Sequence, residues 1–310
     1  MRYIIENKTG IQKKPKISII LLDWKVRESF HTIQYLNRQD INRSDYEIIW
    51  VEFYNYVAKP LSDIIEGCKL SNLPMPIDQW IVLEYPDSFY YHKHVMYNSG
   101  ILHAKGDIIV IMDSDAIVKT DFLSFIINEF DKNPNIILHI EEIRNFDHKF
   151  YPFSYPTLEE ILGNGIAMPY EVKVFNKTEI NLGKSVISLK EDPNLMHVYN
   201  YGSCFCIKRD NLIAIGGADE HIDYLGHICG PYEMTFRLIN AGFEDRLSPS
   251  YFIYHVYHPN QGGDNNYCGP NNGRGVSTTA IAVSEEGRVL PLKENEEIEK
   301  LRTQNYLSSS

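Results

Sequence analysis

Two aspartates separated by a single serine follow an apolar run in this chain. Residues 108–112 read IIVIM, and Asp113, Ser114 and Asp115 come directly after them. Such an unbroken run is typical of a strand that is buried on both faces in a parallel sheet. Two ionised carboxylates at the end of a buried strand repel each other unless they share a cation. The pattern therefore predicts a bound cation next to Asp113 and Asp115.

The elements that position these aspartates are predicted from hydrophobic periodicity. Strands are expected over residues 16–24, 46–53, 80–85 and 108–112, and helices over residues 27–39, 60–70 and 92–105. This alternation predicts βαβ units and an α/β fold, with a mostly parallel central sheet and helices on both faces. Ligands of such sheets bind at the carboxyl ends of the strands. Asp23 and Glu52 fall at two of these ends.

The second half of the chain is less regular in sequence. The elements expected there are a helix from Thr120 or Asp121 to residue 130, a strand leading into a helix over 201–210, a turn at 216–220, a helix over 231–243, a strand over 252–259 and a helix over 294–306. Residues 145–195 are interrupted by Tyr, Pro and Gly and are expected to carry acceptor-side loops. We expect a tail (1–15), a main domain (16–260) with halves 16–115 and 116–260, and a loop followed by a C-terminal helix (261–310).

The bulk composition argues against some classes of function. With 30 Lys+Arg against 41 Asp+Glu the formal net charge is −11, which does not fit the basic face of a nucleic-acid-binding protein. No apolar run approaches the ~20 residues that cross a bilayer, and the mixed N-terminal sequence shows no secretory signal. We expect a cytoplasmic protein, with peripheral contact to the inner membrane face and a homo-oligomer left open.

One block of residues resembles a known family. The block N-x-G-x-x-x-A-x-G-D-I-I contains Asn98, Gly100, Ala104, Gly106 and Asp107 and runs directly into the D-x-D sequence. With KISIILLDW, YEIIWVEF and GGADE, it resembles the family 2 glycosyltransferases of the GT-A fold over roughly residues 15–260. The resemblance implies a nucleotide-diphosphate sugar as donor and a glycan, lipid-linked or other hydroxyl acceptor. It also implies Mn²⁺ or Mg²⁺, inverting transfer of a hexose, and a place in bacterial surface glycan or glycoconjugate synthesis.

The resemblance further implies roles for the residues at the strand ends. Asp115 would coordinate the metal bound to the diphosphate, and Asp113 would reach the metal, the ribose or the sugar. The expected donor-binding residues are Asp23, Trp24, Glu52, Asn98, Asp113 and Ser114. Glu52 would lie against a uracil-like ring, which favours a UDP-sugar. The alternatives are that the aspartates cap the next helix and that Glu52 is a solvated carboxylate.

The third metal ligand is expected from the sequence H-x-x-H near the end of the last predicted strand. In several GT-A enzymes a histidine in this region binds the metal, and His258 is favoured over His255 because Pro259 and a loop follow it. Residues three apart on a strand point to opposite faces, so the two histidines are not expected to bind one ion together. Ordinary loop histidines are the alternative.

Two positions depart from the pattern of the family. Many members carry Arg before the Asn of the block, where this chain has Tyr97; the missing charge could come from Lys93, His94 or Lys105. An acidic pair usually precedes the R-L of a late helix, but residues 230–231 are Gly-Pro here. Nearby acids are Asp219, Glu220, Asp223 and Glu233. Asp219 or Glu233 is expected to contact the acceptor or to act as general base.

The Gly- and Asn-rich stretch over residues 260–276 predicts a long loop. As a lid it would close over donor and metal and exclude water, with Tyr267, Asn271, Asn272 and Arg274 as hydrogen-bond donors. As a linker it would have no such role.

Two other functions are alternatives to glycosyl transfer: a non-catalytic or atypical GT-A relative that binds nucleotide sugar or glycan, and a sugar-phosphate nucleotidyltransferase. The latter usually has a Gly-rich sequence after its first strand, and this chain has none there.

Overall fold

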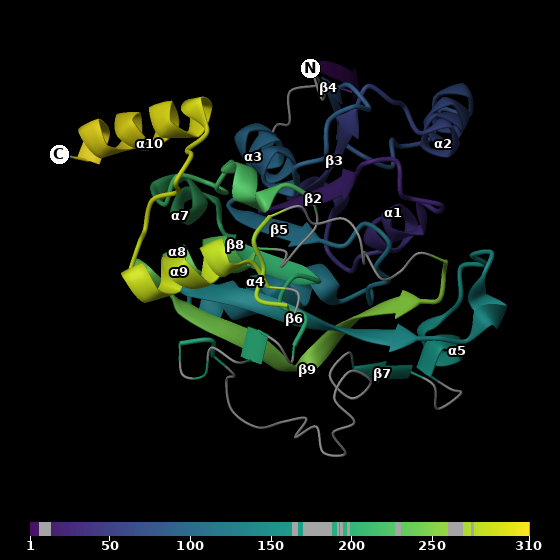
Figure 1. Cartoon of the computed structure of the whole chain (residues 1–310). Helices are drawn as coiled ribbons and strands as arrows, with labels where there is room; N and C mark the ends of the chain where they lie inside the picture. The colour runs from purple at the N-terminus through teal and green to yellow at the C-terminus, as the bar shows by residue number, and fades with distance from the viewer. Residues whose placement is uncertain are drawn as a thin grey trace.

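One mixed β-sheet with helices on both faces forms the centre of the molecule (Figure 1). The computed structural model describes residues 1–5, 14–162, 167–169, 188–190, 192, 195–196, 199–226, 231–259, 269–273 and 276–309. The strands are β1 (Arg2–Ile5), β2 (Ile17–Asp23), β3 (Tyr46–Tyr54), β4 (Gln79–Tyr85), β5 (Ile108–Met112), β6 (Ile136–Asn145), β7 (Ala167–Pro169), β8 (Cys204–Lys208) and β9 (Glu244–Val256). The α-helices are α1 (His31–Leu36), α2 (Lys59–Leu70), α3 (Lys93–His103), α4 (Phe122–Lys132), α5 (Leu158–Leu162), α7 (Arg209–Ala214), α8 (Tyr232–Asn240), α9 (Thr278–Glu286) and α10 (Glu296–Ser309).

The sheet has a parallel part and a mixed part. Among the described strands the order is β1-β4-β3-β2-β5-β8-β6-β7, and β9 also pairs with β6. Strands β4, β3, β2 and β5 are parallel neighbours. Strand β8 is antiparallel to both β5 and β6, whereas β9 runs parallel to β6. The α/β fold class is confirmed, and the regular βαβ part is the half that contains the predicted acidic strand ends.

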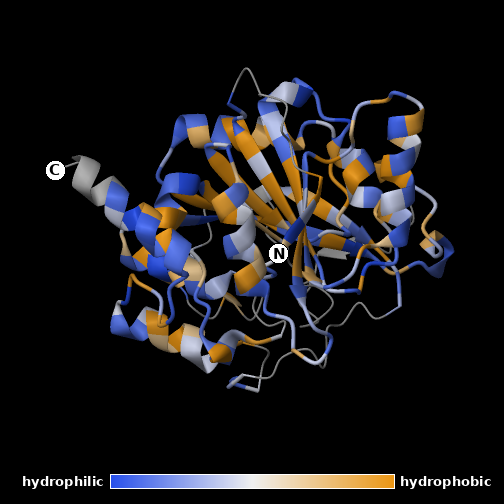
Figure 2. Ribbon diagram, turned by 90° about the horizontal axis from the view of Figure 1, so that it is seen from above, coloured by the Kyte–Doolittle hydropathy of each residue, from blue (hydrophilic) through white to orange (hydrophobic). Residues whose placement is uncertain are grey.

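Two apolar cores lie on opposite faces of the sheet. Helices α1, α2 and α4 cover one face, with Leu36, Leu61 and Phe122 buried against β2, β3 and β5. Helices α3, α7, α8 and α10 cover the other face, where Ile101 and Leu238 are buried. Figure 2 shows the central strands coloured mainly as hydrophobic, which fits a sheet that is covered on both sides.

Several sequence expectations need correction. The expected N-terminal tail contains β1, which pairs antiparallel with β4. The helix expected over 27–39 is reduced to α1, because Asp23 Oδ1 accepts hydrogen bonds from Val26 N (2.9 Å) and Arg27 N (3.2 Å) and holds the preceding residues as a loop. The last strand begins at Glu244 and ends at Val256, not at residue 259. Strands β6 and β7 were not expected.

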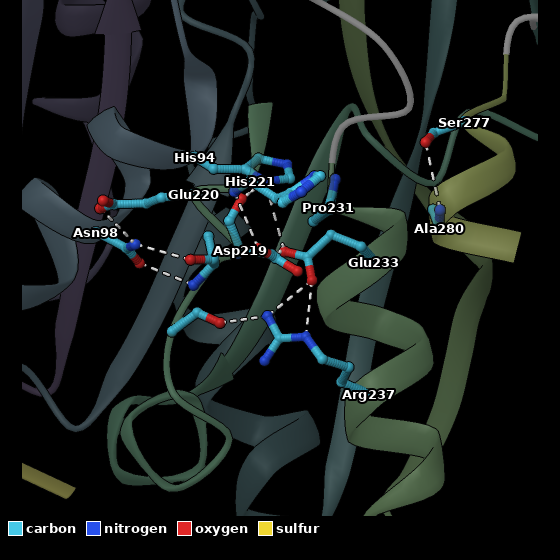
Figure 3. Close-up of polar contacts among 12 residues, drawn as sticks. His94, Asn98, Asp219, Glu220, His221, Pro231, Glu233, Arg237, Ser277 and Ala280 are labelled. Carbon is cyan, nitrogen blue, oxygen red and sulfur yellow. Dashed lines mark hydrogen bonds and ion pairs between the residues drawn. The ribbon is translucent and has the colours of Figure 1, made fainter. Parts of the chain in front are cut away.

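The C-terminal region also contains more structure than a loop and one helix. Helix α9 (Thr278–Glu286) has Ser277 as its N-cap, and Ser277 Oγ accepts a hydrogen bond from Ala280 N at 3.3 Å (Figure 3). Val283 of α9 is buried in a small core with Phe236 of α8. Helix α10 (Glu296–Ser309) buries Ile298 against the core next to α3 and α7. Among the described helices, none is long and apolar enough to cross a membrane.

Candidate active site

The carboxyl ends of β2, β3 and β5 bring the predicted acidic residues to one edge of the sheet. Asp23 and Glu52 are cross-strand neighbours in the register of β2 and β3. Ser114 Oγ donates a hydrogen bond to Leu22 O at 2.6 Å, which fastens the turn after β5 to the end of β2. The Ser114 hydroxyl, which was expected to contact the donor, therefore holds the turn formed by residues 113–115 against the end of β2.

Asp115 lies beside two histidines that follow each other closely at the end of β9. His258 Nε2 lies 3.1 Å and His255 Nε2 lies 3.4 Å from Asp115 Oδ2, and the two Nε2 atoms are 3.1 Å apart. One ligand atom of each side chain lies within 4.8 Å of the others. One carboxylate oxygen and two imidazole nitrogens suit Mn²⁺ better than Mg²⁺, because Mg²⁺ prefers oxygen ligands. The group fits a divalent cation.

Both histidines belong to this group, so the argument that separated them was wrong. Side chains alternate between faces only within a strand, and β9 ends at Val256, before His258. Conversely, the group within 4.8 Å includes Asp115, His255 and His258 but not Asp113. Asp113 instead lines the neighbouring pocket, which is the position expected of a carboxylate that faces ribose or sugar.

Three residues that the sequence did not single out position Asp115. His31 Nε2 hydrogen-bonds Asp115 O at 2.7 Å, and Thr32 Oγ1 donates to Ala116 O at 2.7 Å, so the start of α1 fixes the backbone of the turn. Arg27 NH1 forms an ion pair with Asp115 Oδ2. All three come from the loop and helix directly after β2, a region whose sequence carries only the signal of a short amphipathic helix.

Burial and neighbouring charges separate the two aspartates electrostatically. Burial would raise the pKa of Asp115, but Arg27 and His255 hold it well below its usual range. Burial raises the pKa of Asp113 to about 6, against the opposing charge of Lys93. Burial lowers the pKa of His258, yet its hydrogen bond with Asp115 outweighs this and leaves that pKa raised. The ionised form is thus favoured more strongly for Asp115 than for Asp113, and a carboxylate that binds a metal is ionised.

A pocket opens beside the aspartates and contains the predicted Trp24. Its lining residues are Leu22, Trp24, Arg27, Lys93, Tyr97, Ile111, Met112, Asp113, Ser114 and Gly202. The Trp24 ring is stacked on Tyr91 with centroids 4.4 Å apart, and Lys93 Nζ lies 5.0 Å from the Trp24 centroid. The pocket therefore brings an aromatic ring and two cationic side chains, Lys93 and Arg27, next to Asp113.

Of the three residues that could replace the missing arginine, the structure favours Lys93. Lys93 lies one helical turn before Tyr97 on α3, so both side chains point into the same pocket. His94 Nδ1 instead hydrogen-bonds Asp219 O at 2.7 Å, away from the pocket. Lys105 is exposed, and it follows the end of α3.

Glu52 is not a solvated strand-end carboxylate. It is 1% exposed, and its Oε1 accepts a hydrogen bond from Trp50 Nε1 at 2.9 Å. Burial, followed by the neighbouring Asp23, raises the pKa of Glu52 well above its usual range.

The side chain of Asn98 connects helix α3 to the turn at residues 216–220. Its Nδ2 donates to Ala218 O at 2.8 Å and to Glu220 Oε1 at 3.0 Å, and its Oδ1 accepts from Ala218 N at 2.8 Å (Figure 3). The side-chain amide is thus hydrogen-bonded on both sides within the protein, and the expected contact of Asn98 with the donor stays a prediction. Gly106 of the same block permits close packing, since a Cβ there would lie 2.6 Å from Ser18 N of β2.

The two expected catalytic carboxylates, Asp219 and Glu233, are both buried and hydrogen-bonded (Figure 3). Asp219 accepts from Leu292 N (2.7 Å), Lys293 N (2.9 Å) and His221 N (3.0 Å), so it ties the C-terminal segment to the turn at 216–220.

Glu233 Oε1 accepts from Asp219 N at 3.0 Å, and its Oε2 pairs with Arg237 at 2.7 Å. Burial raises the pKa of Glu233 to about 7. These contacts give both acids positioning roles, and neither is placed as the general base that was expected.

Most of the expected lid lies outside the described residues. Of residues 260–276, the structure describes only 269–273 and 276, so Tyr267 and Arg274 lie outside the described residues. Within the described part, Asn272 N donates to Val276 O at 3.0 Å. The prediction of a lid remains a prediction.

Comparison with known proteins yields one family match. Residues 91–189, which include α3, β5, β6 and both aspartates, match the model described as "Glycosyl transferase family 2". No curated protein sequence matches the chain.

Solved structures resemble the fold at low sequence identity. TarS 1–349 from S. aureus, solved in complex with UDP-GlcNAc, is 11% identical with a TM-score of 0.56, over 93% of this chain and 71% of that chain. GalNAc-T7, solved with UDP, GalNAc and Mn²⁺, is 13% identical with a TM-score of 0.54, over 95% and 55%. A longer TarS chain from S. aureus is 13% identical with a TM-score of 0.53, over 79% and 37%. This chain thus spans less than two thirds of the two latter chains.

Proposed function

Because this chain carries a family 2 glycosyltransferase domain on a GT-A fold, we propose that it is a metal-dependent enzyme that moves a sugar from a nucleotide-diphosphate sugar to an acceptor hydroxyl. The observation that carries the proposal is the group Asp115, His255 and His258 beside the pocket of Trp24 and Lys93. Asp115, His255 and His258 would hold Mn²⁺ or Mg²⁺. When bound, such an ion acts as a Lewis acid that stabilises the leaving diphosphate.

The residues of the pocket support a UDP-sugar as donor. Trp24 offers an aromatic wall, and Lys93 and Arg27 offer positive charge for the diphosphate. The family resemblance would place the base of the nucleotide near the adjacent strand ends, which carry the buried Glu52 and its neighbour Asp23. Two of the solved structures with the same fold carry UDP or a UDP-sugar, which agrees with this choice.

Inverting transfer is proposed from the family resemblance, because we assign no residue as the general base. Inverting transfer needs a group that takes the proton of the acceptor hydroxyl. Asp219 and Glu233 are occupied by structural hydrogen bonds, so we assign them to positioning the helix α8 and the turn that precedes it. The anomeric configuration of the product, read by NMR, distinguishes inversion from retention.

The proposal is tested by the dependence of UDP binding on Mn²⁺. Asp115→Asn should remove the gain in UDP affinity that Mn²⁺ gives to the wild type, a loss on the order of 10- to 100-fold. Calorimetry measures this directly. The control is Asp107→Asn at the opposite end of β5, where the carboxylate pairs with Lys14 and is 56% exposed.

A second variant separates metal binding from folding. Asp115→Asn also deprives Arg27, whose side chain is only 11% exposed, of its ion pair. His258→Gln leaves that pair intact and should reduce the Mn²⁺ effect as well. Identical UDP affinities with and without Mn²⁺ in the wild type would remove metal dependence from the proposal. A non-catalytic relative would bind the UDP-sugar with Mn²⁺ but release no UDP over time, and a nucleotidyltransferase would require a sugar phosphate as second substrate.

A further inference from the structure

An exposed row of aromatic rings lies next to the candidate metal group. We call residues 151–155, which read YPFSY, the aromatic loop. Its outer residues Tyr151 and Tyr155 are 40% and 44% exposed. Exposed aromatic side chains that gather at one place mark binding sites more often than single exposed side chains do.

Each exposed tyrosine is held by a second ring that stands at right angles to it. Tyr151 meets Tyr257 with centroids 6.4 Å apart at an interplanar angle of 85°. Tyr155 meets Phe153 with centroids 5.0 Å apart at 80°. Such edge-to-face pairs are favourable and fix the orientation of a ring. The two tyrosines therefore present ordered surfaces to solvent, which is how a ligand-stacking residue is pre-organised.

The supporting rings connect the aromatic loop to the metal group. Phe153 stacks on His31 with centroids 3.6 Å apart, and His31 hydrogen-bonds Asp115 O at 2.7 Å. Tyr257 directly precedes His258 in the chain and stacks on His148 with centroids 3.8 Å apart. The start of the loop at Tyr151 and its centre at Phe153 thus contact residues that adjoin His258 or hold Asp115.

The backbone at Tyr155 adds an independent observation. Tyr155 has a φ of +54°, a region that bulky side chains rarely adopt. A conformation of this kind is retained when the surrounding structure or the function requires it. Here it accompanies a ring that is 44% exposed and therefore contributes little to the core.

We propose that Tyr151 and Tyr155 form the acceptor subsite of the enzyme and stack against the pyranose rings of a glycan. The apolar C–H face of a pyranose is attracted to the negative face of an aromatic ring. Its hydroxyls need polar partners at the rim, and the exposed Glu28, which interacts electrostatically with Tyr151, supplies a carboxylate near it. This inference rests on the proposed function only in naming the bound glycan as the acceptor. The binding of a glycan by these tyrosines does not depend on the proposed function.

The experiment is saturation-transfer NMR on the full chain, with maltotriose, cellotriose and triacetylchitotriose as probes. Transfer to at least one trisaccharide is expected in the wild type, and it should weaken about five- to tenfold in Tyr151→Ala and Tyr155→Asn. Tyr155→Phe, which keeps the ring, and Tyr3→Ala, which removes a tyrosine of similar exposure (38%) on β1, should keep the signal. Absence of transfer from all three probes, or equal transfer in the double variant Tyr151→Ala/Tyr155→Asn, would overturn the subsite.

Two further readouts separate this result from folding and from the proposed function. Asn accepts a positive φ more readily than Tyr, so Tyr155→Asn should melt at the same temperature as the wild type or higher while it loses glycan binding. A lower melting temperature with unchanged binding would assign Tyr155 a purely structural role. UDP affinity with Mn²⁺ should be the same in all variants; if the wild type binds no UDP but its glycan contacts depend on the tyrosines, the subsite stands and the proposed function fails.

Discussion

Strands β5 and β6 belong to the same sheet, with only β8 between them, yet they bury different chemistry. Strand β5 consists of Ile, Val and Met, all buried, and its charges come only after its end, at Asp113 and Asp115. Strand β6 buries His139, Glu141 and Glu142 within its length. Strand β5 thus keeps charge out of its length and places it after its end, whereas β6 carries buried polar and charged side chains within its length.

The buried polar groups of β6 are retained because they are hydrogen-bonded to the rest of the second half. His139 Nδ1 hydrogen-bonds Tyr201 O at 2.9 Å, and Glu141 Oε2 accepts from Asn200 N at 3.1 Å. Burial raises the pKa of Glu141 to about 8. Glu142 pairs with Arg144 at 2.8 Å. These bonds connect β6 to the segment before β8, so charge in this half holds chain segments together.

The difference between the halves is open to a direct test, with the largest effect expected at Arg237. Arg237 is fully buried, pairs with Glu233 at 2.7 Å and donates to Ile215 O at 2.5 Å. Arg237→Met leaves a buried carboxylate without its counter-ion, which should lower the free energy of unfolding by about 3–5 kcal/mol. Urea denaturation measures this loss.

The matched variant in the first half is Arg43→Met. Arg43 pairs with Asp78 at 2.7 Å but is 34% exposed, so its removal should cost about 1 kcal/mol or less. Equal losses in the two variants would show that buried charge does not distinguish the halves.

At the strand ends of the first half, removal of charge should affect binding more than stability. Lys93 lines the pocket beside Asp113, and a hydrogen bond from a charged group contributes about 1.5–3 kcal/mol. Lys93→Met should therefore weaken UDP binding about 10- to 100-fold and change the urea midpoint little. Lys105→Met, at an exposed position after the same helix, is the control for calorimetry. Unchanged UDP affinity in Lys93→Met would show that Lys93 does not bind the diphosphate.

The same difference explains which elements the sequence could predict. Strand β5 is a continuous apolar run, and β2 and β3 contain the apolar runs IILL and IIWV. Such runs identify buried strands without knowledge of the tertiary structure. Strand β6 was missed because His139, Glu141 and Glu142 interrupt its pattern, and their partners come from residues about 60 positions away. The long β9 was predicted only in its aromatic second part.

The candidate site was predictable to the same extent. Asp113 and Asp115 follow from the strand pattern, and His258 from the resemblance. The roles of Arg27 and His31 depend on how a loop folds back onto the turn after β5, which local spacing does not encode. Asn98 was assigned to the donor because it belongs to the family block, but its amide faces Ala218, more than a hundred positions later in the chain.

The contact between Asn98 and the turn at 216–220 provides the finest test, because it joins the two halves. Gly217 has a φ of +68°, and a Cβ there would lie 2.5 Å from Ile298 Cδ1, the end of a flexible side chain, and 2.6 Å from Asn98 Oδ1, which is fixed by its hydrogen bonds. Gly242 has a φ of +97° with nothing within 4 Å of its Cβ position. Gly242→Ala should lose about 1–2 kcal/mol through its backbone conformation alone, and Gly217→Ala should lose about 1 kcal/mol more because it displaces the amide.

A double-mutant cycle with Asn98→Ala isolates that additional loss. Once the amide is gone, the alanine methyl at position 217 no longer collides with it, so the two changes should be less than additive by about 1 kcal/mol. Gly242→Ala and Asn98→Ala share no partner and should add within about 0.5 kcal/mol. Additive losses in both cycles would mean that the turn is held by the Asp219 and Glu220 contacts without Asn98, and that the family block does not connect the halves through this residue.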